Sequence, residues 1–361
     1  MSSQIRIGII GSGGIAQAHA RAYKEIADVD IVAVADIVPG RAEQFTQIME
    51  LPYAKAFQQH QDLLKLGLDG VSICTPNVAH HRTSIDALLA KTHVLLEKPM
   101  SVTLAEAVEM VQVSKKSGKI LTIGFQPRYD PNMAIIKQIV QSNQLGKVYY
   151  VQAGGGRRRG MPGGTFIQKE IAGAGAMADI GCYSLDLVMN ALSYPKPLTV
   201  TAFTSNYFGT NPLYHAESSK FDVEDFGVAM VRFENDVVLN FKISWAMHMD
   251  TLGDTLFLGT EGGLKIKPAG AGVWSGAWDG KVGSIQLFHD IQGHHTDSNI
   301  PLKEHKINLF YEKVADFVRA VREDAPAPIP GEQIVRNQAV IDGILRSSAS
   351  GREVEIHIPH F

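Results

Sequence analysis

The sequence predicts an α/β protein with two domains, and three of its features point to that class. Its length of 361 residues suits about two domains, each with its own core. Short apolar runs alternate with helical stretches over the first third, which is typical of a parallel sheet covered by helices. Beyond Pro127, longer segments alternate apolar and polar residues, as antiparallel strands do. We therefore expect a doubly wound domain over residues 1–126 and an α+β domain with a mostly antiparallel open sheet over 127–361.

In the first domain, five short apolar runs are expected to be strands buried on both faces, because they are rich in Val, Ile and Leu. They cover residues 5–10, 31–36, 70–74, 93–97 and 120–125. The stretches between them carry helical periodicity. We expect the first helix to end near residue 27, the second to start near residue 40, the third to reach residue 89 and the fourth to run from 104 to 117. Strands separated by helices predict right-handed crossovers into one parallel sheet.

In the second domain, residues 237–245 carry the clearest strand pattern. Apolar side chains fall on alternate positions and would share one face, namely Leu239, Phe241, Ile243 and Trp245. Residues 226–233 precede them across the turn residues Asn235 and Asp236, so we expect a hairpin. Helical spacing predicts two further helices, over 310–321 and 334–348, joined by a stiff Pro-rich connector at 325–330.

Composition narrows the classes of function. The 34 basic and 37 acidic side chains give a net charge of −3, so no overall positive field would attract nucleic acid or an anionic membrane. The two cysteines, Cys74 and Cys182, cannot define a disulfide framework, which favours a reducing compartment. No apolar run reaches the ~18 residues of a membrane helix, and glycines interrupt the segment that precedes a signal-like Ala16-Gln17-Ala18. We expect a cytoplasmic protein.

A glycine-rich turn directly after the first expected strand predicts a dinucleotide site of the Rossmann type. Residues 11–16 match G-x-G-x-x-A, in which one glycine permits the turn and another lets the backbone approach a pyrophosphate. The helix that follows offers unpaired N–H groups to the phosphates. The residues expected to contact the cofactor here are Gly11, Gly13, Gly14 and Ile15.

Asp36 closes the second expected strand and favours NAD over NADP. A carboxylate at this position can accept hydrogen bonds from the adenine ribose, and it would repel a 2′-phosphate. Two alternatives stay open. Asp36 could simply cap a strand end or a helix, and the nearby Arg41 could hold a 2′-phosphate.

Further motifs give the chain a family resemblance. Residues 74–80 (CTPNVAH) end one expected strand and 96–99 (LEKP) end the next, and 124–129 (GFQPRY), 179–181 (DIG), 259–263 (GTEGG) and 347–352 (SSASGR) follow in order. In this order the motifs resemble the glucose-fructose oxidoreductase / inositol dehydrogenase / MocA family of nicotinamide-dependent sugar and polyol oxidoreductases. The resemblance covers nearly the whole chain and is far more specific than any single motif.

The resemblance implies roles for individual residues. Lys98 would sit between nicotinamide and substrate and hold the reacting hydroxyl, and Pro99 would follow a cis bond. Glu97 would orient the lysine region, although Glu97 and Lys98 could also be a surface ion pair. Further residues are implied to contact the nicotinamide half of the cofactor (Thr75, Asn77, His80 and Gln126) or the substrate (Arg128).

Asp179 and Tyr183 are the second pair of candidate catalytic residues. They lie four residues apart in an expected helix over 176–192, so both should face one way, with Asp186 one turn further on. Most members of the family have histidine where this chain has Tyr183, and some have tyrosine as proton donor and acceptor. Tyrosine in place of histidine at position 183 favours a catalytic pair of Tyr183 and Lys98, in which the Lys98 ammonium would stabilise the Tyr183 phenolate. Packed, purely structural roles for Tyr183 and Asp179 stay open.

The expected reaction is reversible hydride transfer between NAD and a carbinol carbon of a sugar, a glycoside or a cyclic polyol. Tyr183 or Lys98 would take the hydroxyl proton, and Asp179 would orient the substrate. Two alternatives remain: a hydrolase or lyase that oxidises its sugar transiently with tightly held NAD, and a non-catalytic NAD-responsive binding protein.

The basic segment 157–159 and Lys169 offer secondary substrate ligands. Arg158 and Lys169 are our choices, against the alternative that the run is a solvated face. His289, His294, His295 and Asp297 lack metal-ligand spacing, so we expect no metal site. A long sheet with one face not covered by helices predicts a homodimer or homotetramer.

Overall fold

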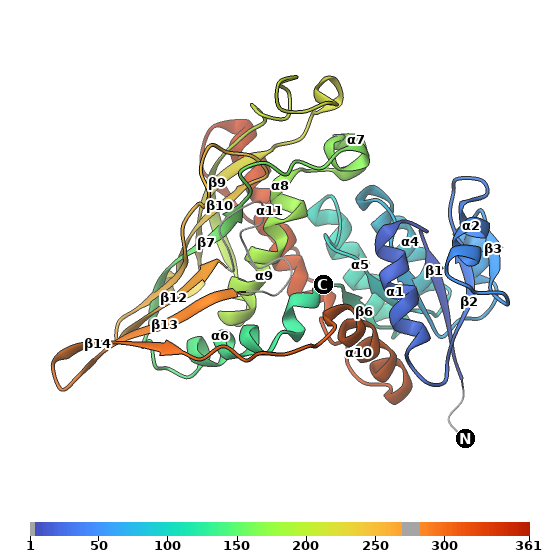
Figure 1. Ribbon diagram of the computed structural model, residues 1–361, viewed down its shortest axis with the longest axis horizontal. Coiled ribbons are helices and arrows are strands. Elements are labelled where there is room, and N and C mark those ends of the chain that lie inside the picture. The colour runs from blue at the N-terminus through green and yellow to red at the C-terminus, as the bar shows by residue number, and fades with distance from the viewer. Residues whose placement is uncertain (1–3, 269–281) are drawn as a thin grey trace. The chain divides into compact units, whose positions relative to one another are not determined.

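The computed structural model describes residues 4–268 and 282–361, and the chain packs into two compact units (Figure 1). Unit 1 contains residues 1–126, 307–335 and 359–361, and unit 2 contains residues 127–306 and 336–358. The first division falls after Gln126. The second expected domain differs from unit 2, because residues 307–335 and 359–361 pack with unit 1 instead.

Unit 1 is built on a parallel sheet of six strands in the order β3-β2-β1-β4-β5-β6. This is the strand order of a doubly wound dinucleotide-binding domain, so the expected fold class is confirmed. The short β3 was not expected, since three residues carry no recognisable pattern. The strands are β1 (Ile5–Ile10), β2 (Val29–Ala35), β3 (Lys55–Phe57), β4 (Gly70–Ile73), β5 (His93–Leu96) and β6 (Leu121–Ile123).

The helices of unit 1 follow the crossovers of this sheet. They are α1 (Gly14–Lys24), α2 (Arg41–Ile48), α3 (His60–Leu64), α4 (Asn77–Leu89), α5 (Leu104–Ser117) and α10 (Leu309–Glu323). Local signals set the ends of α5: the Thr103 side chain and Glu106 form a capping box, and Gly118 follows in the left-handed conformation.

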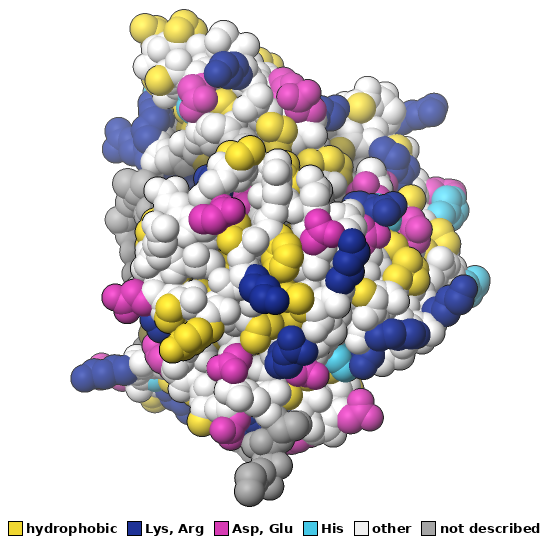
Figure 2. Space-filling model, turned by 90° about the vertical axis from the view of Figure 1, so that its right-hand side faces the viewer, with side chains coloured by type: hydrophobic (Ala, Val, Ile, Leu, Met, Phe, Trp, Pro, Cys, Tyr) yellow, Lys and Arg dark blue, Asp and Glu magenta, His cyan; other side chains and the backbone are white. Residues whose placement is uncertain are grey.

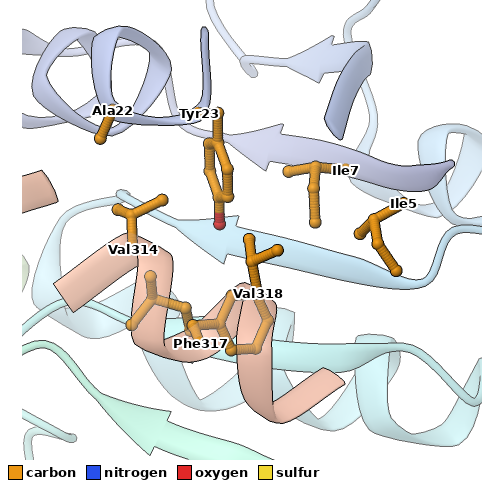
Figure 3. Close-up of a cluster of buried hydrophobic side chains, with 8 residues drawn as sticks. Ile5, Ile7, Ala22, Tyr23, Val314, Phe317 and Val318 are labelled. Atoms are coloured by element: carbon orange, nitrogen blue, oxygen red, sulfur yellow. The ribbon is translucent and has the colours of Figure 1, made fainter. Parts of the chain in front are cut away.

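Helix α10 completes the core of unit 1. Val314, Phe317 and Val318 point toward a cluster of side chains from the first strand and first helix (Figure 3), which includes Ile5, Ile7, Ala22 and Tyr23. Gly70 lets the Phe317 ring approach β4, because a Cβ there would lie 2.9 Å from the ring. This contact explains why α10 belongs with unit 1 although it lies far along the chain.

Unit 2 is built on a mixed sheet of nine strands in the order β14-β13-β12-β11-β7-β10-β9-β8-β15. Every neighbouring pair is antiparallel except β7 and β10, which run parallel. The expected mostly antiparallel sheet is thus confirmed. The strands are β7 (Val148–Gly156), β8 (Pro197–Ser205), β9 (Phe226–Phe233), β10 (Val238–Ser244), β11 (Thr255–Gly259), β12 (Gly262–Pro268), β13 (Val282–Ile291), β14 (His294–Ile300) and β15 (Val354–Glu355).

The expected hairpin of residues 226–245 is also confirmed. β9 pairs with β10 across a turn in which Asn235 and Asp236 both have a φ of 64°. The side chains of Leu239, Phe241 and Ile243 are buried on one face, and α9 packs against this part of the sheet.

The helices of unit 2 differ from expectation at one place. The continuous helix expected over 176–192 is broken at Ile180 into α8 and α9. Gly181 begins α9 against Ile243, where a Cβ would lie 3.1 Å away. The helices are α6 (Pro131–Gln141), α7 (Lys169–Ala172), α8 (Ala176–Asp179) and α9 (Gly181–Ala191), while α11 (Gly331–Ser350) begins in unit 1 and continues in unit 2. Short 3-10 helices lie at Gln126–Tyr129, Gly164–Ile167, Ser218–Lys220 and Glu234–Asp236.

Basic and acidic side chains are interspersed on the face drawn in Figure 2, in keeping with the net charge of −3.

Across the described residues, no single helix is long and apolar enough to cross a membrane. The segments 169–179 and 181–191, bent by 50°, reach that length and composition only as a pair.

Candidate functional site

The glycine turn after β1 forms an open cradle at the carboxyl edge of the parallel sheet. Gly11 has a φ of +88°, and a Cβ there would lie 2.6 Å from the Cys74 carbonyl oxygen, so only glycine fits. A Cβ on Gly13 or Gly14 would meet nothing within 4 Å. Because no side chain caps the start of α1, its first N–H groups face this open space. Gly11, Gly13, Gly14 and the half-buried Ile15 therefore fit a pyrophosphate.

Asp36 is tied to the same turn. Its Oδ2 accepts hydrogen bonds from the Ser12 backbone N–H (2.9 Å) and the Ser12 hydroxyl (2.6 Å), and its Oδ1 accepts one from the Val38 N–H (3.0 Å). Burial alone would raise the pKa of this carboxyl, but these hydrogen bonds and the Arg41 charge lower it overall. A carboxylate thus stands beside the cradle, where it can repel a 2′-phosphate.

The segment after β4 is locked to the segment after β5 by His80. Its Nδ1 lies 2.7 Å from the Pro99 carbonyl oxygen and its Nε2 lies 3.0 Å from the Thr75 carbonyl oxygen. Burial lowers the pKa of His80. The expected cis bond between Lys98 and Pro99 is present. His80 thus connects the two loops through their carbonyl oxygens, and its expected contact with the nicotinamide stays a prediction.

Other residues expected at this edge are accessible to different degrees. Lys98 and Asn77 are half-buried, and Asn77 opens α4. Thr75 has a buried hydroxyl with no hydrogen-bond partner among the described residues, which is a polar group suited to a ligand. Gln126 is 2% exposed at the end of unit 1.

Glu97 points into unit 1 and is not part of a surface ion pair. Its Oε1 lies 2.8 Å from His19 Nε2 and accepts a hydrogen bond from the Lys313 ammonium. With 5% of its area exposed, Glu97 is held within unit 1 next to Lys98, and its expected contact with the cofactor stays a prediction. Burial raises the pKa of a carboxyl, but Lys313 and His19 together hold that of Glu97 well below its usual range.

In unit 2, three side chains meet where β7 and β10 end. The parallel pairing aligns Gly156 with Ser244, so the next residues, Arg157 and Trp245, emerge at one edge. Trp245 Nε1 donates to Asp179 Oδ2 at 3.1 Å.

Arg157 is the charged member of this group. It is 6% exposed, and burial lowers its pKa to about 10 although the Asp179 charge acts to raise it. Sequence analysis did not select Arg157 or Trp245, because only the pairing of two distant strands brings them to Asp179.

The remaining expected residues of unit 2 are dispersed. Tyr183 is buried in the first turn of α9 and Asp179 is the last residue of α8, so the two do not lie on one continuous helix as expected. Arg158 and Lys169 are exposed, in keeping with the solvated alternative. Arg128 forms a buried ion pair with Asp186 (2.7 Å), which engages its guanidinium within the protein and not toward a substrate.

The histidines and the aspartate for which we expected no metal site lie on β13 and β14. His295 is exposed and pairs with Asp290 at 2.8 Å. Within residues 4–268 and 282–361, no group of three or more His, Cys, Asp or Glu side chains is arranged to hold a metal ion.

Comparisons with known proteins assign the family. Residues 5–125 match the family described as "Oxidoreductase family, NAD-binding Rossmann fold", and residues 133–265 match the "GFO/IDH/MocA C-terminal domain". The chain is 31% identical to the D-glucoside 3-dehydrogenase of Escherichia coli (strain K12) over 277 residues, which cover 74% of this chain and 78% of that protein.

Two further comparisons extend this result. The chain is 30% identical to the glucose-6-phosphate 3-dehydrogenase of Bacillus subtilis (strain 168) over 187 residues, covering 51% of this chain and 52% of that protein. A solved levoglucosan dehydrogenase in complex with NADH and levoglucosan shares the fold, with a TM-score of 0.80, 20% identity and coverage of 98% and 99% of the two chains. The chain belongs to the GFO/IDH/MocA family of NAD-binding oxidoreductases.

Proposed function

We propose that this oxidoreductase uses NAD to oxidise, reversibly, a secondary alcohol of a sugar, a glycoside or a cyclic polyol. The observation that carries the proposal is the edge of the parallel sheet, where the open Gly11–Ala16 cradle follows the carboxyl end of β1 and the Lys98 side chain follows that of β5, with β4 between the two strands. Ligands of open α/β sheets bind at this edge. The names of two relatives, both 3-dehydrogenases of glucose derivatives, support C3 of a glucoside as the first position to test.

When bound, NAD supplies the acceptor for the hydride. The residues of the chain have to bind the alcohol, fix its orientation and move its proton. We assign the holding of the reacting hydroxyl to Lys98 and the transfer of its proton to Tyr183 or Lys98, since a base must lie within about 3 Å of that oxygen. Lys98 belongs to unit 1 and Tyr183 to unit 2.

In unit 2, Asp179 would accept hydrogen bonds from a second hydroxyl of the substrate. Trp245 occupies one carboxylate oxygen and the Arg157 charge lies close by, so Asp179 is held in a fixed place. Fixed orientation of this kind contributes several kcal/mol to lowering a barrier. The buried Arg157 replaces Arg158 and Lys169 as our preferred basic residue for substrate recognition.

The test is a panel of monosaccharides, inositols and glycosides, assayed with NAD and NADP by the absorbance of the reduced nicotinamide. The variant Lys98→Met should lose at least about a thousandfold in kcat, because the group that holds the hydroxyl is gone. NAD affinity should stay within about threefold of wild type. Lys116→Met, which removes an exposed lysine from α5, is the matched control and should change neither quantity.

Three outcomes would contradict the proposal. Unchanged turnover in Lys98→Met would remove Lys98 from the reaction. Turnover without added NAD, with cofactor that co-purifies, would indicate a hydrolase or lyase. NAD binding without turnover of any substrate would indicate an NAD-responsive binding protein.

We also propose a cytoplasmic homo-oligomer. Both cysteines are buried thiols outside any disulfide, which suits a reducing compartment. Strand register places four exposed apolar side chains on the sheet face opposite Leu239 and Phe241. They are Phe203 (51% exposed), Met230 (47%), Leu258 (36%) and Phe288 (37%). An apolar face of this kind is suited to a second copy of the chain.

A further inference from the structure

A network of polar side chains lies buried within the apolar core of unit 1. It joins α1, β4, α10 and the residue after β5. Lys313 donates to Glu97, whose other neighbour is His19 Nε2 at 2.8 Å. From His19 the network continues to the Ser72 hydroxyl (2.9 Å from Nδ1) and on to the Tyr23 hydroxyl (2.8 Å). None of these five side chains belongs to a residue more than 5% exposed.

A buried lysine at position 313 is unusual on the apolar face of α10, and its ion pair with Glu97 gives a reason for it. Its neighbours Val314, Phe317 and Val318 fill the apolar core, yet Lys313 itself is 1% exposed. Burying an ion pair gains little stability compared with a well-packed apolar pair. The lysine therefore points to a requirement for a charged carboxylate at Glu97.

Glu97 is confined on every side that the structure describes. Gly124 lies against it, and a Cβ there would be 2.9 Å from Glu97 Oε1. The carboxylate also accepts a hydrogen bond from the backbone N–H of Lys98 at 3.3 Å. A buried, ionised and immobile group thus directly precedes and contacts the residue to which we assign the reacting hydroxyl.

We propose that Lys313 is a positioning residue for Lys98, which it reaches through Glu97, with His19 as the second support of that carboxylate. The inference rests on the proposed function of Lys98. Lys313 supplies the counter-charge, Gly124 supplies the space, and together they fix the backbone from which Lys98 extends. Loss of either should disturb Lys98 more than the pyrophosphate cradle, since the Ser12 hydrogen bonds that tie the cradle run to Asp36 and not to Lys313 or Gly124.

Charge balance around Glu97 gives the proposal a chemical signature. The other titratable groups that interact with Glu97 are His19, Cys74 and His80, and Lys98 adjoins it. Without Lys313, no cation would offset the negative charge of Glu97 from that side. The Glu97 carboxylate would stabilise the ammonium form of Lys98. Less Lys98 would then be present as free amine at a given pH.

The first experiment measures the amine directly and needs no substrate. Lys98 is labelled competitively with acetic anhydride between pH 7 and 10, and each lysine is followed by mass spectrometry. In Lys313→Met we expect Lys98 labelling to fall at least about threefold at pH 8–9, while Lys116 labels as in wild type. In the double variant Glu97→Gln/Lys313→Met, which removes both charges, Lys98 labelling should return to near the wild-type rate.

The second experiment separates positioning from charge and from folding. Gly124→Ala keeps every charge but displaces Glu97. Both Gly124→Ala and Lys313→Met should lose about tenfold to a hundredfold in kcat, the size of effect that a misplacement near 1 Å produces. NAD affinity and the folded spectrum should be retained. Arg319→Met, on the exposed face of α10, is the control and should match wild type.

The outcomes are decisive in both directions. Unchanged or faster Lys98 labelling in Lys313→Met, or kcat values equal to wild type in both single variants, would overturn the inference. An active Lys98→Met would instead overturn the proposed function. If Lys313→Met does not fold, Gly124→Ala and the double variant still decide the matter.

Discussion

At the scale of single residues, Asp36 shows how one carboxylate can support a loop and select a ligand. Two of its hydrogen bonds come from Ser12, inside the glycine turn. The first alternative raised by the sequence, a purely structural Asp36, is therefore met in part, since Asp36 closes the turn while it also places a negative charge beside the cradle. Arg41 contributes to lowering the pKa of Asp36, so its charge is balanced by this carboxylate.

The variant Asp36→Ala should raise KM for NAD at least about tenfold, because the ribose partner is lost, and should narrow the preference for NAD over NADP, because the repelling charge is lost. Initial rates with both cofactors measure this. Asp30→Ala removes an exposed aspartate from the same strand and is the matched control. An unchanged ratio of the two cofactors would argue against the assignment of Asp36.

Adjacent arginines offer a second comparison at this scale. Arg157 is buried beside Asp179, whereas Arg158 is exposed. We expect Arg157→Met to lower kcat/KM at least about tenfold, because a buried charge partner is removed, and Arg158→Met to stay within about twofold. Steady-state kinetics on the best substrate of the panel measure both. Equal effects of the two substitutions would show that burial does not distinguish these arginines.

At the scale of elements, local signals were sufficient for some helices and strands and insufficient for others. Helix α5 begins and ends where expected because its capping box and terminal glycine lie within the segment itself. The break between α8 and α9 was missed, because the contact made there is distant in sequence: Gly181 begins α9 against the Ile243 side chain, from which a Cβ would lie 3.1 Å away.

The residues of the candidate site also fall into two groups, those that local sequence motifs reveal and those that depend on distant contacts. The glycine turn, Asp36 and the Glu-Lys-Pro segment are contiguous motifs and could be found in the sequence. The buried positions of Glu97 and Arg157 could not, because each depends on a partner that folding brings near. Lys313 is 216 positions from Glu97, and no short motif connects them.

The contact between β5 and the start of β6 is expected to make the stability of the fold depend on pH. His93 Nδ1 accepts the Ile120 N–H at 3.2 Å, and burial, with help from Lys119, lowers the pKa of His93 from 6.5 to about 4. The unfolded chain therefore binds more protons between these values, so stability falls as pH falls through that window.

We expect the free energy of unfolding to drop by roughly 2 kcal/mol from this group between pH 6.5 and 4. His93→Asn keeps an acceptor for Ile120 without the titration and should show a smaller drop. Urea denaturation at several pH values measures the slopes, with the exposed His294→Asn as control. Identical slopes for wild type and His93→Asn would contradict this origin.

At the scale of the whole molecule, the proposed assembly rests on the exposed apolar side chains of the nine-stranded sheet. A lysine at Met230 on β9 would place a charge on the face that the proposal buries against a second copy. We expect Met230→Lys to shift the protein to monomers in light scattering coupled to size exclusion. Met249→Lys, in a loop with the side chain 61% exposed, should leave the oligomer intact. A monomeric wild type would contradict the proposed assembly.

The return of α10 to the first unit also has a consequence for biosynthesis. On the ribosome, Ile5, Ile7 and Tyr23 emerge early, but Val314, Phe317 and Val318, which cover them, emerge only after strands β7 to β14 of the second sheet have been translated. The nascent cofactor domain must therefore wait with an uncovered apolar surface, which is a natural binding site for chaperones. A nonsense mutation anywhere before residue 309 would release a fragment that lacks α10 and cannot close this core.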